Sequence, residues 1–267
     1  MLEKMKTVLA GALTITAVSL GIATYHGVDV SELSVPPLPE QAQSFLSPLL
    51  YNANATQENM DDIVVETNAT RMRRQVRDAA VEVITPLGRG SGTLFKVDGH
   101  YLVFTAAHVI RDFPVVAIAG RNGEQVFGTT ILTATNVDMA IILVPEMNSR
   151  TPMAYKPADH RNIDDLVGED VTYTGFPSHH DLLTIDGVIA SEEDGNLVMH
   201  SYAWPGSSGS GVFDMRGRFI GVVRAVDVGV WSYQMPPQLV EDMVWIAPAW
   251  DISKREIRQH LRARGQQ

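Results

Sequence analysis

After residue 80, apolar residues gather into short segments bounded by glycine, proline or charged residues. Three of these segments, at residues 80–84, 196–199 and 219–226, combine valine, isoleucine, leucine or methionine with few polar positions. Short apolar segments that are flanked by turn-forming residues are typical of strands. We therefore predict strands at these three places.

Two other segments have a helical pattern. Residues 71–77 contain four arginines around apolar positions, which predicts a short basic helix leading into the first strand. We interpret its charged side as a solvated face rather than a processing site or a contact with anionic lipid. Residues 251–257 are predicted to open a C-terminal helix, with Asp251 as its N-cap.

The N-terminal region carries an uncharged, largely apolar run at residues 7–24, preceded by Lys4 and Lys6. Such a run is long for a cleaved signal and short for a membrane-spanning helix. We predict a signal anchor or a signal peptide over residues 1–26 and favour the anchor. Because the lysines precede the run, the rest of the chain is expected on the outer side. A buried helix of a soluble protein is the alternative.

Residues 27–68 are interrupted by several prolines, with serine, asparagine and glutamine between them: Pro36, Pro37, Pro39 and Pro48. This composition predicts a flexible linker or stalk. The folded domain then comprises residues 69–267, which is enough chain for one compact domain.

Composition excludes several kinds of function. The net charge of −10 argues against general nucleic-acid binding, which needs a basic surface. The chain has no cysteine, so neither disulfides nor thiolate metal sites are available to it. His179, His180 and Asp181 are neighbours in a predicted loop, and adjacent residues seldom converge on one ion. We expect neither a metal nor another cofactor.

The candidate chemistry centres on residues 205–211, Pro-Gly-Ser-Ser-Gly-Ser-Gly, which favour backbone freedom over packing. Alone, such a run is more typical of a flexible linker. Here it lies between two predicted strands, and upstream segments supply His108 and Asp138. A serine nucleophile needs a base to accept its proton and an acid to orient that base. The chain order His, Asp, Ser therefore predicts a catalytic triad of His108, Asp138 and Ser208.

The glycines of the same run have a second task. Acyl transfer builds negative charge on the substrate's carbonyl oxygen, and preorganised N–H donors stabilise that charge. We predict an oxyanion hole built from the backbone of Gly206, Ser207 and Ser208. A tight turn at Gly206 directs the N–H groups of Gly206 and Ser208 at the oxygen.

Several separated segments resemble the trypsin-like peptidases of the HtrA-type bacterial branch and their viral relatives. They are Gly-Ser-Gly-Thr-Leu-Phe at 90–95, Asp-Gly-His-Tyr-Leu at 98–102, Thr-Ala-Ala-His-Val at 105–109, Tyr-Thr-Gly-Phe-Pro at 173–177 and Gly-Val-Ile-Ala-Ser at 187–191. The resemblance implies an all-β fold of two six-stranded antiparallel β-barrels with a C-terminal helix and a catalytic cleft between the barrels. It also implies a serine endopeptidase that cleaves polypeptides through an acyl-enzyme on Ser208.

Two residues that depart from the family pattern change the activation and the substrate preference that we expect. Ser207 stands where zymogen-activated trypsins carry an aspartate, so activation by a newly cut N-terminus is not expected. Tyr202 stands where trypsins carry the aspartate that selects Lys and Arg, so a basic preference is not expected either. By the same resemblance, Val223, Arg224 and Ala225 line the pocket wall and offer backbone hydrogen bonds to an extended substrate. We interpret the Arg224 side chain as facing solvent rather than selecting acidic residues.

Three other functions compete with this one. A catalytically silent protease-fold protein, acting by interaction on a cell envelope or virion, has no physical need of a complete triad. A self-processing viral protease would cleave its own chain once. An α/β-hydrolase would place its histidine after the serine, where only His260 lies, inside the predicted C-terminal helix.

The predicted location is outside the cytoplasm. The peptidase is expected to be membrane-anchored through residues 7–24, or secreted or periplasmic if that segment is cleaved. Its expected partners are polypeptide substrates and no nucleic acid. HtrA-type relatives often form trimers, but the N-terminal segment shows no clear trimer motif, so the sequence leaves the oligomeric state open.

Overall fold

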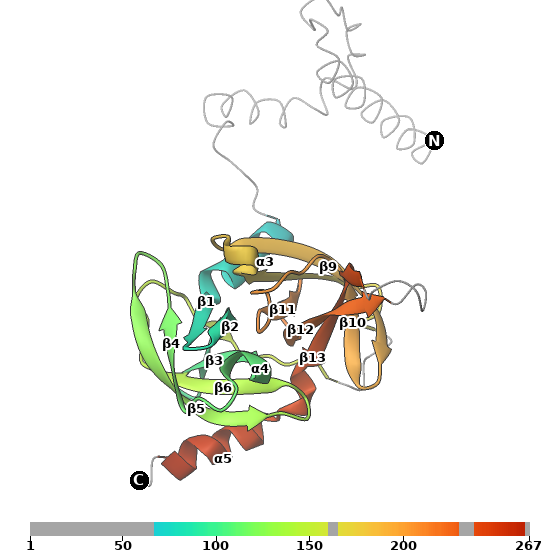
Figure 1. The fold of residues 1–267 in the computed structure, drawn as a ribbon. Helices are drawn as coiled ribbons and strands as arrows, with labels where there is room; N and C mark the ends of the chain where they lie inside the picture. The colour runs from blue at the N-terminus through green and yellow to red at the C-terminus, as the bar shows by residue number, and fades with distance from the viewer. Residues whose placement is uncertain (1–66, 160–164, 230–237, 265–267) are drawn as a thin grey trace, which may run out of the picture. The chain divides into compact units, whose positions relative to one another are not determined.

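The computed structural model describes residues 67–159, 165–229 and 238–264. In this part of the chain two β-barrels pack against each other, and a helix flanks each end, as Figure 1 shows. The predicted segment 1–26 and nearly all of the predicted linker lie outside the described residues. Within the described ranges, no helix combines the length and the apolar character that crossing a membrane requires.

The first barrel has six antiparallel strands in the order β1-β4-β5-β6-β3-β2, and β1 pairs with β2 to close it. A short strand, β7, adds to β2 in parallel. The strands are β1 (Ala80–Thr85), β2 (Gly88–Val97), β3 (His100–Ala106), β4 (Val115–Ala119), β5 (Gln125–Ala134), β6 (Met139–Val144) and β7 (Met153–Ala154). Between β3 and β4 lies the four-residue helix α4 (Ala107–Ile110).

The second barrel is closed by six strands in the order β10-β13-β12-β11-β8-β9. The strands are β8 (Asp170–Gly175), β9 (Leu183–Glu193), β10 (Asn196–His200), β11 (Gly211–Asp214), β12 (Phe219–Gly229) and β13 (Gln238–Pro248), with a 3-10 turn, η3, at Pro177–His179. The three strands predicted from sequence correspond to β1, β10 and β12. The prediction of two six-stranded antiparallel barrels is confirmed.

The basic helix predicted ahead of the first strand is α3 (Asn68–Ala79), and it buries Met72, Val76 and Ala79. Its arginines are more engaged than a solvated face implies. Arg73 forms an ion pair of 2.7 Å with Asp186 of β9. Other arginine contacts also reach the second barrel, since Arg77 Nη1 donates to the Leu182 carbonyl oxygen over 2.7 Å. The helix that precedes the first barrel is therefore fixed to the second.

The C-terminal helix, α5, spans Lys254–Arg264, and the prediction of its N-cap is wrong. Asp251 lies in a separate 3-10 turn, η4 (Ala249–Asp251). The cap is Ser253, whose Oγ accepts a hydrogen bond of 3.1 Å from the N–H of Glu256. Both residues are good N-caps by type, so the sequence alone favoured the one that lies further upstream.

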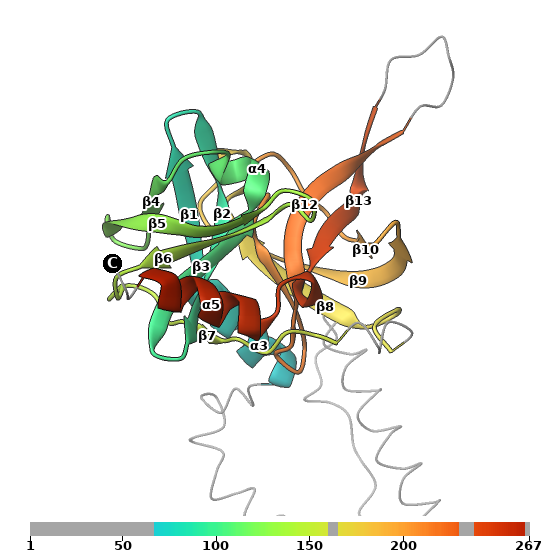
Figure 2. The ribbon, with the colours of Figure 1, turned by 90° about the horizontal axis from the view of Figure 1, so that it is seen from below.

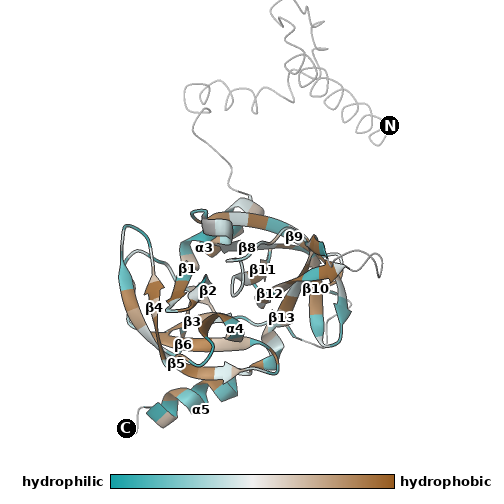
Figure 3. Cartoon of the chain, in the orientation of Figure 1, coloured by the Kyte–Doolittle hydropathy of each residue, from teal (hydrophilic) through white to brown (hydrophobic). Residues whose placement is uncertain are grey.

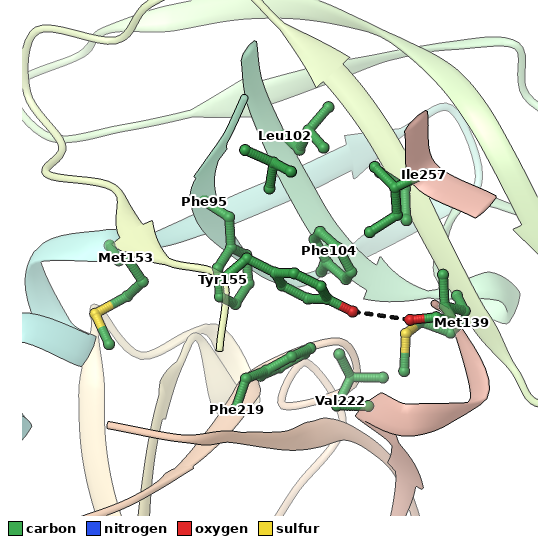
Figure 4. Packing of buried hydrophobic residues seen from close by; sticks show 14 of the residues in the cluster. Phe95, Leu102, Phe104, Met139, Met153, Tyr155, Phe219, Val222 and Ile257 are labelled. Carbon is green, nitrogen blue, oxygen red and sulfur yellow. Dashed lines mark hydrogen bonds between the residues drawn. The ribbon is translucent and has the colours of Figure 1, made fainter. Parts of the chain in front are cut away.

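A shared aromatic core joins the two barrels. Phe95 of β2 is fully buried, and its ring lies 4.9 Å from that of Phe104 and 4.8 Å from that of Phe219, centroid to centroid. Figure 4 shows Tyr155 between Phe104 and Phe219. The Tyr155 hydroxyl donates a hydrogen bond to the Ile252 carbonyl oxygen over 3.0 Å. Phe219 belongs to β12 of the second barrel, so the same cluster closes both barrels.

The hydropathy of the residues matches their place in the fold. Figure 3 shows hydrophobic residues concentrated along the strands of both barrels, whereas α5 is mainly hydrophilic. This helix contributes Ile257 to the aromatic core and exposes most of its charged residues. It therefore seals the core of the first barrel with a single apolar stripe.

We predict that Phe95→Ala lowers the free energy of unfolding by about 3–5 kcal/mol, because it opens a cavity at the centre of the shared cluster. Phe95→Leu retains part of the buried volume and should lower it by less. Urea denaturation of the two variants and the unchanged protein measures the difference. Equal losses for both variants would contradict the prediction, because they would show that the volume retained by leucine contributes nothing to stability.

Candidate active site

The pairing of β3 with β6 brings His108 and Asp138 together. Its register sets Ala106 beside Met139, so the residues that follow β3 and precede β6 meet. His108 Nδ1 lies 2.9 Å from Asp138 Oδ2, and the backbone N–H of His108 donates to Asp138 Oδ1 over 2.9 Å. The Asp138 side chain is buried, whereas about half of the imidazole is exposed.

Asp138 adopts a left-handed backbone conformation, with φ of 55°. Aspartate is among the few residues that tolerate this region. The conformation lets its carbonyl oxygen accept from the N–H of Ala107 over 3.1 Å while both carboxylate oxygens face His108. Because an ionised carboxylate only accepts, Nδ1 of His108 carries the proton and Nε2 is left as an acceptor.

Ser208 lies in a turn that is held by its neighbours' backbone groups. The N–H of Ser207 donates to the Trp204 carbonyl oxygen over 2.8 Å, and that of Ser210 donates to the Ser207 carbonyl oxygen over 3.0 Å. The carbonyl oxygen of Ser208 accepts a bond of 2.8 Å from the N–H of Ser91 in the first barrel. The turn is thus fixed both locally and across the interface between the barrels.

Two glycines are required by this turn. Gly206 has φ of 102°, and a Cβ there would come within 2.4 Å of the Phe176 carbonyl oxygen. Gly209 has φ of 88°, and its Cβ would come within 2.2 Å of the Ser91 carbonyl oxygen. Residues with side chains rarely adopt such φ values, and here they would also collide with backbone. The glycines predicted for freedom of the backbone therefore allow close approach as well.

Of the three backbone N–H groups at residues 206–208, one is hydrogen-bonded and two are available. The N–H of Ser207 is used in the bond to Trp204. The N–H groups of Gly206 and Ser208 donate to no acceptor among the described residues. Available donors of this kind, held by a fixed turn, suit an oxygen that gains negative charge during a reaction.

His108, Gly206 and Ser208 line a common cavity of about 230 Å³. His108 comes from the first barrel and the other two residues from the second, so the cavity lies where the barrels meet. The rest of its wall comes from Thr85, residues 87–89, Val109 and Arg111 of the first barrel and from Pro205. A base, a serine hydroxyl and two available N–H donors therefore share one solvent-accessible space.

Ser91 is a functional candidate that sequence reasoning did not single out. It is fully buried, and its Oγ donates to the Gly206 carbonyl oxygen over 2.7 Å while accepting from the N–H of Phe176 over 2.9 Å. Its carbonyl oxygen accepts from Thr105 Oγ1 over 2.7 Å. The Gly-Ser-Gly segment at 90–92 was the signal, but the role depends on partners more than 80 residues away.

Arg224 points back toward the triad. Its Nε lies 3.6 Å from Asp138 Oδ2, and its Nη1 donates to Asn196 Oδ1 over 2.7 Å. The side chain is about 36% exposed, so it is neither free in solvent nor fully buried. A fixed positive charge consequently lies beside the carboxylate oxygen that faces the imidazole.

The remaining predicted residues do not line the cavity described above. Val223 is buried, and both its backbone groups are bonded, its N–H to the Ser210 carbonyl oxygen and its carbonyl oxygen to the Gly209 N–H. Ala225 is exposed on β12. Tyr202 is 48% exposed, which leaves its ring available at the surface.

Tyr202 is held through its backbone, because its carbonyl oxygen accepts a hydrogen bond from the hydroxyl of Tyr173. Burial raises the pKa of Tyr173 to about 12, so this donor keeps its proton at neutral pH. The rings of Tyr202 and Trp204 lie 6.1 Å apart, centroid to centroid. Two aromatic side chains are thus exposed on the segment that leads to Ser208.

No group of three or more histidine, aspartate or glutamate residues in the described part of the chain is placed to hold a metal ion. His180 and Asp181, which are neighbours in the chain, are among the described residues and form no such group.

Comparisons with known proteins agree with this geometry. Residues 90–222 match the trypsin-like peptidase domain family. The fold is similar to that of the serine endoprotease from Yersinia pestis, with a TM-score of 0.55 and 18% identity over 73% of this chain and 67% of that one. It is also similar to Rv3671c from M. tuberculosis H37Rv, solved as a mutant in an inactive form, with a TM-score of 0.51 and 18% identity over 76% and 94% of the two chains. No curated protein matches the chain by sequence.

The two barrels and the matched segment define a peptidase of the double-barrel class. The chain belongs to the trypsin-like serine peptidases.

We predict that Ser91→Ala slows labelling of the folded protein by a fluorophosphonate about ten- to hundredfold, because small displacements of a reacting turn have effects of this size. It also removes two part-buried hydrogen bonds, to the Gly206 carbonyl oxygen and from the Phe176 N–H, and the loss of about 0.5–1.5 kcal/mol for each lowers the free energy of unfolding. Labelling kinetics and urea denaturation measure the two effects. Ser191→Ala, on the surface of β9, is the control. An unchanged labelling rate in Ser91→Ala would rule out this role.

Proposed function

We propose that this protein is a serine endopeptidase that hydrolyses peptide bonds through an acyl-enzyme on Ser208. The observation that carries the proposal is the hydrogen bond of 2.9 Å between His108 Nδ1 and Asp138 Oδ2, at a cavity that Ser208 also lines. This bond leaves Nε2 of His108 as the acceptor for a hydroxyl proton.

The proposed reaction uses each group in turn. His108 Nε2 accepts the proton of Ser208 Oγ as that oxygen attacks the substrate carbonyl carbon. The N–H groups of Gly206 and Ser208 stabilise the resulting oxyanion. His108 then gives its proton to the leaving amine, and the peptide C–N bond breaks. Water attacks the acyl-enzyme by the same route and releases Ser208.

Asp138 stabilises the imidazolium that forms during both steps. Its two carboxylate oxygens are fixed by separate bonds to the backbone and ring of His108. Arg224 Nε, 3.6 Å from Oδ2, adds positive charge beside the carboxylate oxygen that faces the imidazole. We assign Arg224 a role in positioning the Asp138 carboxylate, in place of the solvent-facing role expected from sequence.

The proposed active conformation needs no newly cut N-terminus. Ser207 is 1% exposed and is satisfied locally, since its N–H donates to the Trp204 carbonyl oxygen and its Oγ accepts from the Trp204 N–H over 3.3 Å. The turn therefore contains no buried charge that waits for a partner. We infer that the chain is active as folded.

The substrate contacts we propose follow from strand geometry. Arg224 and Ala225 lie directly after the last pair of bonds between β12 and the nucleophile turn, so their backbone can pair with a substrate strand. Val223, the third residue predicted for this role, would contribute through its position beside Ser210. Tyr202 is proposed to favour substrates without a basic side chain before the scissile bond.

We also propose that residues 7–24 direct the peptidase out of the cytoplasm, as a membrane anchor or a cleaved signal. The support is their uncharged, apolar composition after Lys4 and Lys6. Fractionation of cells that express the full chain or residues 69–267 tests this proposal. Equal recovery of both in the soluble cytoplasmic fraction would contradict it.

The two rival functions make different predictions from catalysis in trans. A silent interaction protein takes no fluorophosphonate label, and a self-processing protease loses an N-terminal fragment but cleaves no added peptide. Profiling of the protein on a peptide library separates all three. His108 is hydrogen-bonded to Asp138, and Ser208 lines the same cavity as His108. This arrangement favours the endopeptidase.

We predict that Ser208→Ala abolishes fluorophosphonate labelling and peptide cleavage. Asp138→Asn should lower kcat by roughly 10⁴-fold, because the amide favours the wrong imidazole tautomer. Labelling kinetics and initial rates on a cleaved library peptide measure both. Folded wild-type protein that takes no label at any pH from 6 to 9 would refute the endopeptidase.

A further inference from the structure

The cavity that contains Ser208 lies on the first-barrel side of the nucleophile. Apart from the residues of the nucleophile turn, its wall comes from the turn between β1 and β2 with the strand residues beside it, from α4 and from the residue that follows α4. Figure 2 shows that turn and α4 at the same end of the first barrel. None of the described residues of β12 lines the cavity. A substrate that pairs with residues 224 and 225 on one side of Ser208 therefore leaves the site along this cavity on the other side.

The wall of this cavity is positively charged. Arg89 comes from the start of β2, and Arg111 directly follows α4. Among the described residues that line the cavity there is no aspartate and no glutamate. The whole chain has a net charge of −10, so the protein at large repels acidic molecules. The two arginines therefore form a local positive site on an acidic protein.

Arg111 is held in a backbone conformation that suits glycine. Its φ is 50° and its ψ is −125°, and its N–H ends α4 by donating to the Ala107 carbonyl oxygen over 2.8 Å. Residues with a Cβ rarely adopt a left-handed φ, and glycine is the common residue where a helix ends in this way. Strained backbone of this kind is concentrated at sites of function. An arginine at such a position points to a function of its side chain.

Both guanidinium groups have donors available for a ligand. The exposed Arg111 side chain forms no hydrogen bond or ion pair with another described residue. Arg89 Nη1 lies 3.2 Å from Glu82 Oε1, and the Arg89 side chain is 63% exposed. A guanidinium carries five N–H donors, so this one contact leaves others free. Asp112, the next residue after Arg111, is exposed and does not line the cavity.

We propose that Arg89 and Arg111 select substrates with an acidic side chain at the first or second residue after the scissile bond. This inference rests on the proposed endopeptidase function. His108 gives its proton to the leaving amine, so the residues after the scissile bond lie against the wall that carries His108 and α4. Guanidinium groups donate charge-assisted hydrogen bonds to a carboxylate. Successive side chains of an extended chain point to opposite sides, so one of the two positions faces the arginines.

The exposure of the two arginines sets the size of the effect. An exposed ion pair contributes up to about fivefold to an equilibrium or a rate. Two such pairs predict that an acidic substrate is preferred about five- to tenfold over its neutral analogue at 0.1 M salt. In 1 M salt the screening length falls from about 10 Å to about 3 Å, so the preference should fall below about twofold.

The test uses peptides that share one library-derived cleavage sequence and carry glutamate or glutamine at the first or at the second residue after the scissile bond. With the full chain as enzyme, kcat/KM for the glutamate peptide should exceed that for the glutamine peptide about five- to tenfold at one of these positions. Moving the glutamate to the sixth residue should remove the preference. Four further residues of extended chain span about 14 Å, which exceeds the screening length at 0.1 M salt.

Arg111→Gly is the first protein variant, and the ratio of the two kcat/KM values within each variant is the measured quantity. The backbone at this position favours glycine, so thermal unfolding should show no loss of stability. The ratio should nevertheless fall at least about twofold, and Arg89→Gln should lower it as well. Arg111→Lys keeps the charge and should retain most of the ratio. Arg262→Gln, on the exposed side of α5, changes the net charge equally and is the control that should leave the ratio unchanged.

The outcomes separate the two proposals. Equal cleavage of the glutamate and glutamine peptides at both positions overturns the selection of acidic substrates and leaves the endopeptidase intact. A preference that persists when Arg89→Gln and Arg111→Gly are combined overturns the assignment to these two arginines. A folded protein that takes no fluorophosphonate label and cleaves no library peptide overturns both proposals.

Discussion

The hydrogen bond from the Ser91 N–H to the Ser208 carbonyl oxygen is the contact on which the active site depends, because it ties a flexible turn to a barrel wall. Glycines at 206 and 209 make the turn possible, but they also give it freedom that catalysis cannot tolerate. Bonds to Ser91 from one barrel and to Val223 from the other remove that freedom. The serine is thus positioned by two separate closed sheets.

Short-range patterns were enough to predict individual strands and the chemistry of individual segments from sequence. Strands 80–84 and 196–199 carried clear apolar patterns, and the family resemblance supplied their arrangement into two barrels, which the structure confirms. Helix ends were harder, because Asp251 and Ser253 are both good caps and only backbone geometry selects Ser253. Local sequence cannot make that choice when two capping residues lie two positions apart.

Contacts between distant residues account for what the sequence did not reveal. Ser91 was part of a recognised motif, yet its partner Gly206 lies 115 residues away. Arg224 was expected in solvent, and only the packing of the two barrels against each other sets it beside Asp138.

The aromatic cluster shared by the barrels bears on self-digestion, because a peptidase is itself a polypeptide. Phe95, Phe104 and Phe219 contact one another across the junction, so neither barrel can open without exposing the rings of the other. Local openings that would present an extended segment of one barrel are therefore coupled to global unfolding. With no disulfide to restrain it, the chain resists self-digestion through this cooperativity.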